Sequence, residues 1–292
     1  LIGASDDQDQ WNPHPDRDRV AFALYQGSSS LAGSLTPPDA VLTGSGSSSG
    51  FDVAIASHGD LDGDGVAEVV LGEGISLYNT SSGLYSEGVV TILSTRGLSG
   101  SVDLDDADSH IVGGEETLYL GASVGTHDVD GDGYGDLFLG ADGESSFAAE
   151  NGAIYGVFGA SSLPSSDTIA AHYEWVVYGD RGLHRLGDDI EPRAADFDGD
   201  GTVDLVIGSH ERSYAHLFLD AASLSGSYVL SDADIVFGSD SSVTHFGNGL
   251  AKGDWNGDGI TDLAIGAPDD DTYIPHTYAT VPGTVYIYYV SD

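Results

Sequence analysis

The sequence predicts an all-β protein, a β-propeller of about five four-stranded blades that is incomplete at both chain ends. Three observations support this fold class. An acidic loop that runs directly into a strand-like apolar segment occurs four times, Gly is frequent along all 292 residues, and no apolar run approaches a membrane span of roughly 18 residues. Frequent glycine indicates many tight turns between short strands. We therefore expect one repeat-built β domain over residues 1–292.

Four acidic loops define the repeat: DLDGDGVAE, DVDGDGYGD, DFDGDGTVD and DWNGDGITD. Their first residues are Asp60, Asp128, Asp196 and Asp254, so that the steps are 68, 68 and 58 residues. These steps are longer than the repeats of helical solenoids and suit one four-stranded sheet each. A parallel β-helix is the structural alternative, but its rungs are much shorter.

Each repeat contains four strand candidates in a fixed order around its loop. The second strand follows the loop directly, and its continuous apolar residues, as in VVLG and LFLG, predict burial on both faces. The third strand is rich in β-branched and aromatic residues, and a polar connector leads to the fourth. The first strands are expected at 51–59, 119–127, 185–195 and 245–253, the third strands at 88–94, 152–159, 214–220 and 283–290, and the fourth strands at 108–114, 173–180 and 233–240.

The two ends of the chain fall inside repeats. Residues 1–5, 20–27 and 40–46 resemble a second, third and fourth strand, while the last repeat stops after its third strand. Because the chain contains no Met, we expect a processed or excised segment, and part of a larger propeller is the alternative fold. The predicted units are a partial blade at 1–50, blades at 51–118, 119–184 and 185–244, and a partial blade at 245–292.

The strong negative charge of the chain indicates which classes of partner it can attract. Asp and Glu number 48 against eight Lys and Arg, giving a formal net charge of −40. Nucleic acid and anionic membrane surfaces would be repelled, whereas cations would be attracted. With no Cys, the chain cannot use disulfides, and we expect another device to stabilise it.

The loops have the chemistry of a site for a hard cation. Carboxylates at the first, third and fifth places of a tight loop converge on one point, and the carbonyl of the seventh place can join them. Such oxygen sets suit Ca²⁺ better than Mg²⁺, and glycines at the fourth and sixth places, such as Gly63 and Gly65, permit a positive φ. An EF-hand would need Glu at the twelfth place, where these loops have Leu or Ile, and the closing carboxylate comes instead at the ninth.

With these loops and their flanks, the chain resembles the integrin α-subunit type of β-propeller, which is built from FG-GAP repeats. The closest unit is the last, HFGNGLAKGDWNGDGITDLAIGAP, with Phe246-Gly247 before the loop and Gly266-Ala267-Pro268 after it. Earlier units have LG at 120–121 and 186–187 instead of FG. The resemblance implies about four Ca²⁺ ions, held by side chains from the first, third, fifth and ninth places and the carbonyl of the seventh. Carried over to this chain, the ligands are Asp60, Asp62, Asp64, Val66 and Glu68; Asp128, Asp130, Asp132, Tyr134 and Asp136; Asp196, Asp198, Asp200, Thr202 and Asp204; and Asp254, Asn256, Asp258, Ile260 and Asp262.

We therefore expect an extracellular or cell-surface calcium-binding module for protein interaction or adhesion. No GxSxG or HExxH signature is present, so we do not expect an enzyme. The expected partner is another protein or a second copy, with no nucleic acid and no membrane insertion. One alternative is a structural subunit of an extracellular filament or array, assembled by strand or blade completion between chains. Another is a glycan-binding or hydrolytic propeller, in which Trp175, Tyr178 and Tyr273 could stack on sugars, although core positions are favoured for them.

Overall fold

The computed structural model confirms an all-β, propeller-like fold. Its regular structure consists of strands and of single-turn 3-10 helices such as Leu104–Asp106. In the described part of the chain, no helix combines the length and the hydropathy that a membrane span requires. The structure describes residues 2–4, 20–24, 39–44, 53–56, 59–74, 78–80, 83–85, 87–114, 118–146, 148–182, 184–188, 193–209, 213–238, 245–268 and 283–289.

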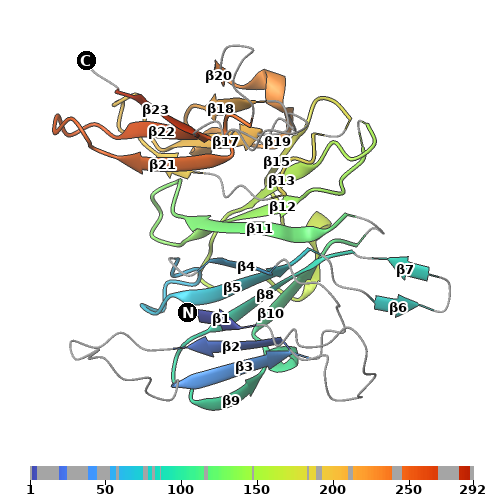
Figure 1. Cartoon of the computed structure of the whole chain (residues 1–292). Coiled ribbons are helices and arrows are strands. Elements are labelled where there is room, and N and C mark those ends of the chain that lie inside the picture. The colour runs from blue at the N-terminus through green and yellow to red at the C-terminus, as the bar shows by residue number, and fades with distance from the viewer. Residues whose placement is uncertain are drawn as a thin grey trace, which may run out of the picture.

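Five sheets, each built on antiparallel strands of one repeat, follow one another in chain order, from the blue strands at the bottom of Figure 1 through the green strands to the orange and red strands in its upper part. Each predicted repeat supplies consecutive strands of one sheet. The first sheet holds β1 (Ile2–Ala4), β2 (Val20–Leu24) and β3 (Ala40–Gly44), and the second holds β4 (Val53–Ala56), β5 (Glu68–Glu73), β8 (Val89–Ser94) and β10 (Ser109–Val112). The third holds β11 (Leu120–His127), β12 (Asp136–Ala141), β13 (Ala153–Val157) and β15 (Trp175–Tyr178). The fourth holds β16 (Arg193–Ala195), β17 (Asp204–Ser209), β18 (Tyr214–Phe218) and β20 (Ile235–Gly238), and the fifth holds β21 (Gly249–Gly253), β22 (Asp262–Ala267) and β23 (Thr284–Tyr288).

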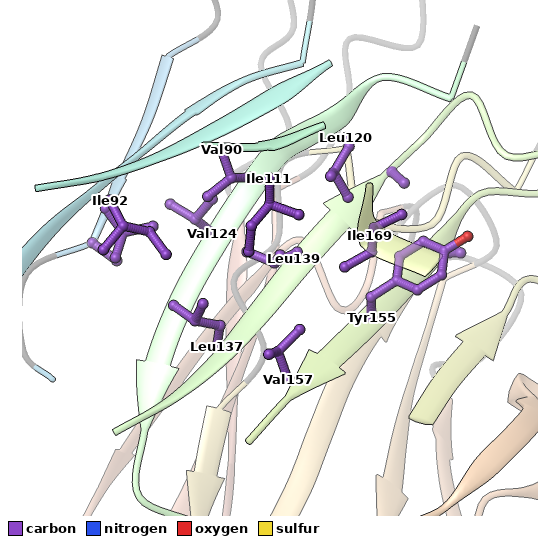
Figure 2. Packing of buried hydrophobic residues seen from close by; sticks show 14 of the residues in the cluster. Val90, Ile92, Ile111, Leu120, Val124, Leu137, Leu139, Tyr155, Val157 and Ile169 are labelled. Carbon is purple, nitrogen blue, oxygen red and sulfur yellow. The ribbon is translucent and has the colours of Figure 1, made fainter. Parts of the chain in front are cut away.

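The hydrophobic core lies between consecutive sheets, because the second strand of each repeat is apolar on both faces. In β12, Leu137 and Leu139 pack toward the second sheet, while Phe138 packs toward the fourth. Figure 2 shows the first of these contacts, where Ile92 and Ile111 meet the side chains of the third sheet. Continuous apolar strands of this kind bury both faces only when sheets stack, which explains why one repeat needs its neighbours.

Glycine lets the backbones of neighbouring sheets touch. A Cβ on Gly72 of β5 would lie 2.3 Å from the carbonyl oxygen of Gly121 in the next repeat, and a Cβ on Gly140 would lie 2.3 Å from that of Gly187. Gly121 and Gly187 are the glycines of the LG pairs, and both have φ near 90°. The LG or FG pair is therefore a backbone contact between blades, which no residue with a side chain could make without displacement.

The structure adds a strand to three of the predicted blades. Parallel strands β9 (Gly100–Asp103), β14 (Asp167–Thr168) and β19 (Gly226–Val229) lie in connectors between third and fourth strands, yet each pairs with the fourth strand of the preceding repeat. These pairings satisfy backbone groups that an edge strand would otherwise expose. A separate hairpin, β6 (Tyr78–Thr80) with β7 (Gly83–Tyr85), follows β5.

Candidate metal sites

All four acidic loops connect the first and second strands of a repeat, and their backbones have the predicted conformation. The fourth-place glycines Gly63, Gly131, Gly199 and Gly257 have φ of 72°, 73°, 81° and 80°. The sixth-place glycines Gly65, Gly133, Gly201 and Gly259 have φ of 86°, 93°, 92° and 91°. A Cβ is disfavoured in this left-handed region, so glycine fixes the sharp turns of the loop.

The ninth-place carboxylate links the end of each loop to its beginning. It is the first residue of the second strand and is almost completely buried in all four repeats. One of its oxygens accepts the N–H of the second place, at distances of 2.7, 2.7, 2.8 and 2.8 Å. The pairs are Glu68 with Leu61, Asp136 with Val129, Asp204 with Phe197, and Asp262 with Trp255.

The other acidic places are oriented by backbone N–H groups of the same loop. In the second loop, Asp128 accepts from Gly131 and Gly133, Asp130 accepts from Asp132, and Asp132 accepts from Tyr134. The third loop repeats these bonds with distances that differ by no more than 0.1 Å. Because the donors are backbone groups, the carboxylates are positioned without help from basic side chains in these two loops.

In three loops the structure brings the first, third and ninth places together. Within each of these clusters, one oxygen from each residue lies within 4.8 Å of the others. The clusters are Asp60, Asp62 and Glu68; Asp128, Asp130 and Asp136; and Asp196, Asp198 and Asp204. Asp64, Asp132 and Asp200, the predicted fifth-place ligands, lie outside them.

The fourth loop keeps the backbone frame without such a cluster. Asp254 accepts from Gly257 and Gly259 at 2.6 and 3.0 Å, as Asp128 and Asp196 do from the corresponding glycines. Its third place is Asn256, which has one charge fewer and donates its side-chain amide to Asp258 at 2.8 Å. The structure therefore does not bring three carboxylates together in this loop, and its four predicted side-chain ligands remain a prediction.

The donor sets fit a divalent cation in the first three loops. Burial, aided by the charges of Asp60, Asp62 and Asp64, raises the pKa of Glu68 to about 7. Burial likewise raises the pKa of Asp136 to about 7 and raises that of Asp204. Moreover, Asp60 Oδ1 and Glu68 Oε1 are buried without a hydrogen-bond partner. Converging oxygens that resist ionisation and lack partners are stabilised by a bound cation.

Sequence reasoning missed one basic residue at the first loop. Arg96 follows β8 and donates its Nε to Asp64 Oδ2 at 2.8 Å, while its Nη2 donates to the Asp64 carbonyl at 2.7 Å. This hydrogen bond holds the pKa of Asp64 below its usual value. The only available signal was a basic residue in a very acidic chain, since 32 residues separate the partners.

The aromatic residues considered for sugar stacking do not form an exposed platform. Trp175 is completely buried and packs at a tilt against Phe138, with ring centroids 6.0 Å apart. Tyr178 packs against the core between the second and third sheets. Tyr273 lies outside the described residues. For Trp175 the core position is the one observed.

The comparison with protein families agrees with the geometry of the loops. The FG-GAP repeat family matches the chain at residues 120–157 and 246–288. Each match begins at the apolar residue of an LG or FG pair and runs through a candidate loop to the third strand, β13 or β23. The same strand order and loop geometry recur outside the two matches, in the repeats that hold β5 and β17. The chain therefore contains FG-GAP repeats at these two places, which is consistent with the FG-GAP repeat family.

Proposed function

We propose that this protein is a calcium-binding FG-GAP module that acts outside the cytosol in protein interaction or adhesion. The observation that supports it best is the convergence of three carboxylates in each of three loops, with two buried, unpartnered oxygens in the first. Oxygen-only sites of high negative charge favour Ca²⁺ over softer metals. Solvated acidic turns without metal would not require buried carboxylates with raised pKa values.

The ligands would come from the first, third and ninth places, joined by the fifth-place carboxylate and the seventh-place carbonyl that the family resemblance implies. Bound Ca²⁺ would supply positive charge that neutralises these carboxylates and fixes the loops between neighbouring strands. The backbone N–H groups would keep each carboxylate oriented before the cation arrives. The role proposed for the metal is structural, and we propose no catalytic step.

The proposed location follows from the same chemistry. Weak calcium sites, with Kd on the order of 10⁻⁴ to 10⁻³ M, fill only where free Ca²⁺ is high, as it is outside cells. FG-GAP repeats typically occur in extracellular proteins. The strong negative charge disfavours nucleic acid, and a protein partner is the proposed ligand of the assembled blades.

Thermal unfolding of the full chain with Ca²⁺, with Mg²⁺ and with a chelator tests the proposal. At free Ca²⁺ of about 100 times Kd, each site should stabilise the folded chain by about 2.7 kcal/mol. We expect a higher midpoint with Ca²⁺ and a much smaller rise with Mg²⁺. Asp136→Asn should reduce the calcium-dependent rise. A midpoint that is the same with Ca²⁺ and with chelator would refute calcium binding.

A second candidate function is assembly of the chain with further copies, favoured by the outward face of the fifth sheet. Val285 and Ile287 are 66% and 46% exposed. By strand register, Val285 corresponds to Val90 and Ile154, which the next sheet buries almost completely. The fifth sheet thus presents an apolar face of the kind that is covered at the earlier junctions. We propose that a second copy covers it.

A further inference from the structure

The first loop differs from the second and third in how its buried carboxylates are paired. Glu68 accepts the Leu61 N–H through Oε2, but Oε1 has no partner, although Glu68 is only 1% exposed. In the next two repeats the second oxygen is used. Asp136 Oδ1 accepts from Gly159 at 2.8 Å, and Asp204 Oδ1 accepts from Asp220 at 3.1 Å.

The first place shows the same difference. Asp60 Oδ1 is buried and unpartnered, whereas the Oδ1 atoms of Asp128 and Asp196 accept fourth-place N–H groups at 2.8 and 2.7 Å. Asp60 and Glu68 belong to one cluster of oxygens. Among the four acidic loops, only the first therefore has buried carboxylate oxygens without a hydrogen-bond partner, and these oxygens would gain most from a bound cation.

A positively charged side chain of the protein, Arg96, already lies against this loop. The guanidinium of Arg96 holds both the side chain and the carbonyl of Asp64, the fifth-place residue. By strand register, Arg96 corresponds to Ala160 in the third sheet and Ala221 in the fourth. Neither alanine carries charge, so the second and third loops have no such competitor at this position.

We propose that Arg96 competes with the metal ion at the first loop and so determines how tightly this loop binds it. This inference rests on the proposed calcium function. To recruit Asp64, the ion must displace a charged hydrogen-bonding partner, and it also approaches a like charge. The first loop therefore binds more weakly than its carboxylates alone would allow, and this penalty shrinks as salt screens the exposed guanidinium.

Calcium titration of the chelator-stripped full chain by isothermal calorimetry tests this role. We expect Arg96→Ala, and Arg96→Gln as a second neutral variant, to tighten one class of site several-fold at low salt, and less at high salt. The other sites should not change. Arg181→Ala is the matched control, because Arg181 is exposed on the connector between β15 and β16, not on a strand that flanks an acidic loop, and it should leave every affinity unchanged.

A second substitution identifies the site. In an Asp60→Asn background, Arg96→Ala should no longer tighten any site, because the loop it acts on is disabled. Circular dichroism checks that every variant is folded. Absence of calcium uptake by the unmodified chain would overturn both the proposed function and this role. Normal calcium uptake with no tightening in the neutral variants, or with tightening that survives Asp60→Asn, would overturn the role of Arg96 alone.

Discussion

His216 is the residue whose burial has the clearest pH consequence away from the candidate metal loops. It lies on β18 with 7% of its surface exposed, and its Nδ1 has no hydrogen-bond partner. Burial lowers its pKa to about 4, aided by neighbouring His184 and opposed by a backbone hydrogen bond of Leu230 and by the charge of Asp180. An unfolded histidine has a pKa of about 6.5, so below that pH the unfolded chain binds a proton that the native chain does not.

This difference predicts a loss of stability as pH falls from about 6.5 to 4, reaching roughly 3 kcal/mol for His216 alone. The raised pKa values of Glu68 and Asp136 oppose this loss of stability. As pH falls, these buried carboxylates take up protons in the native chain before they do in the unfolded chain, which stabilises the native chain. Urea unfolding in chelator at pH 7.0 and 4.5 should therefore be compared between the unmodified chain and His216→Leu. We expect the free energy of unfolding to decrease less between pH 7.0 and 4.5 in the variant than in the unmodified chain. Equal decreases would show that His216 does not cause the loss of stability in acid.

At the scale of the element, the contact between blades depends on glycine in the second strand. An alanine methyl at Gly72 would lie 2.3 Å from the Gly121 oxygen and 2.8 Å from Val124 Cγ1. Since the nearest atom is backbone, β5 and β11 would have to separate. We expect Gly72→Ala to lower the free energy of unfolding by about 1–3 kcal/mol, the usual range for overpacking, and toward the upper end because the nearest atom is backbone.

Gly249→Ala is the matched control for this prediction. Gly249 also lies in a strand, β21, but no heavy atom lies within 4 Å of an added Cβ. Its free energy of unfolding should change by no more than about 0.5 kcal/mol. Chemical denaturation of both variants measures the difference. If the two substitutions cost the same, the close approach of the blades does not limit stability.

The same element scale explains what the sequence could predict. The second strands and their loops were predictable because an uninterrupted apolar run and a DxDxDG pattern are local signals. Strands β9, β14 and β19 were not, since each is short, mostly polar and formed by pairing with another repeat's edge. At the sites, burial of the ninth place could be expected from its position before an apolar strand. The guanidinium contact at Asp64 could not, because it depends on how a distant connector folds back.

At the scale of the whole molecule, the five described sheets stand in sequence and meet at four junctions. The four hydrophobic clusters lie one at each junction, so stability accumulates between neighbours rather than within one central core. Neighbouring loops also touch, since Gly135 of the second loop donates to the Asp60 carbonyl of the first at 2.8 Å. A cation bound in the first loop, as proposed, would therefore also stabilise the junction with the next repeat.

The outer face of the fifth sheet gives the last prediction. Val285, Ile287 and Tyr289 alternate along and just beyond β23 and are 66%, 46% and 59% exposed, while Tyr286 and Tyr288 pack inward on the fourth sheet. Burying such a face against a second copy would remove apolar surface from water, which favours association once calcium and salt reduce the repulsion between acidic chains.

Light scattering with Ca²⁺ tests this association, and we expect a molar mass that rises with protein concentration. Val285→Asp should remain monomeric, whereas Ile55→Asp, at an exposed apolar position on β4, should associate normally. An unmodified chain that stays monomeric at high concentration, or association that survives Val285→Asp, would contradict assembly through this face.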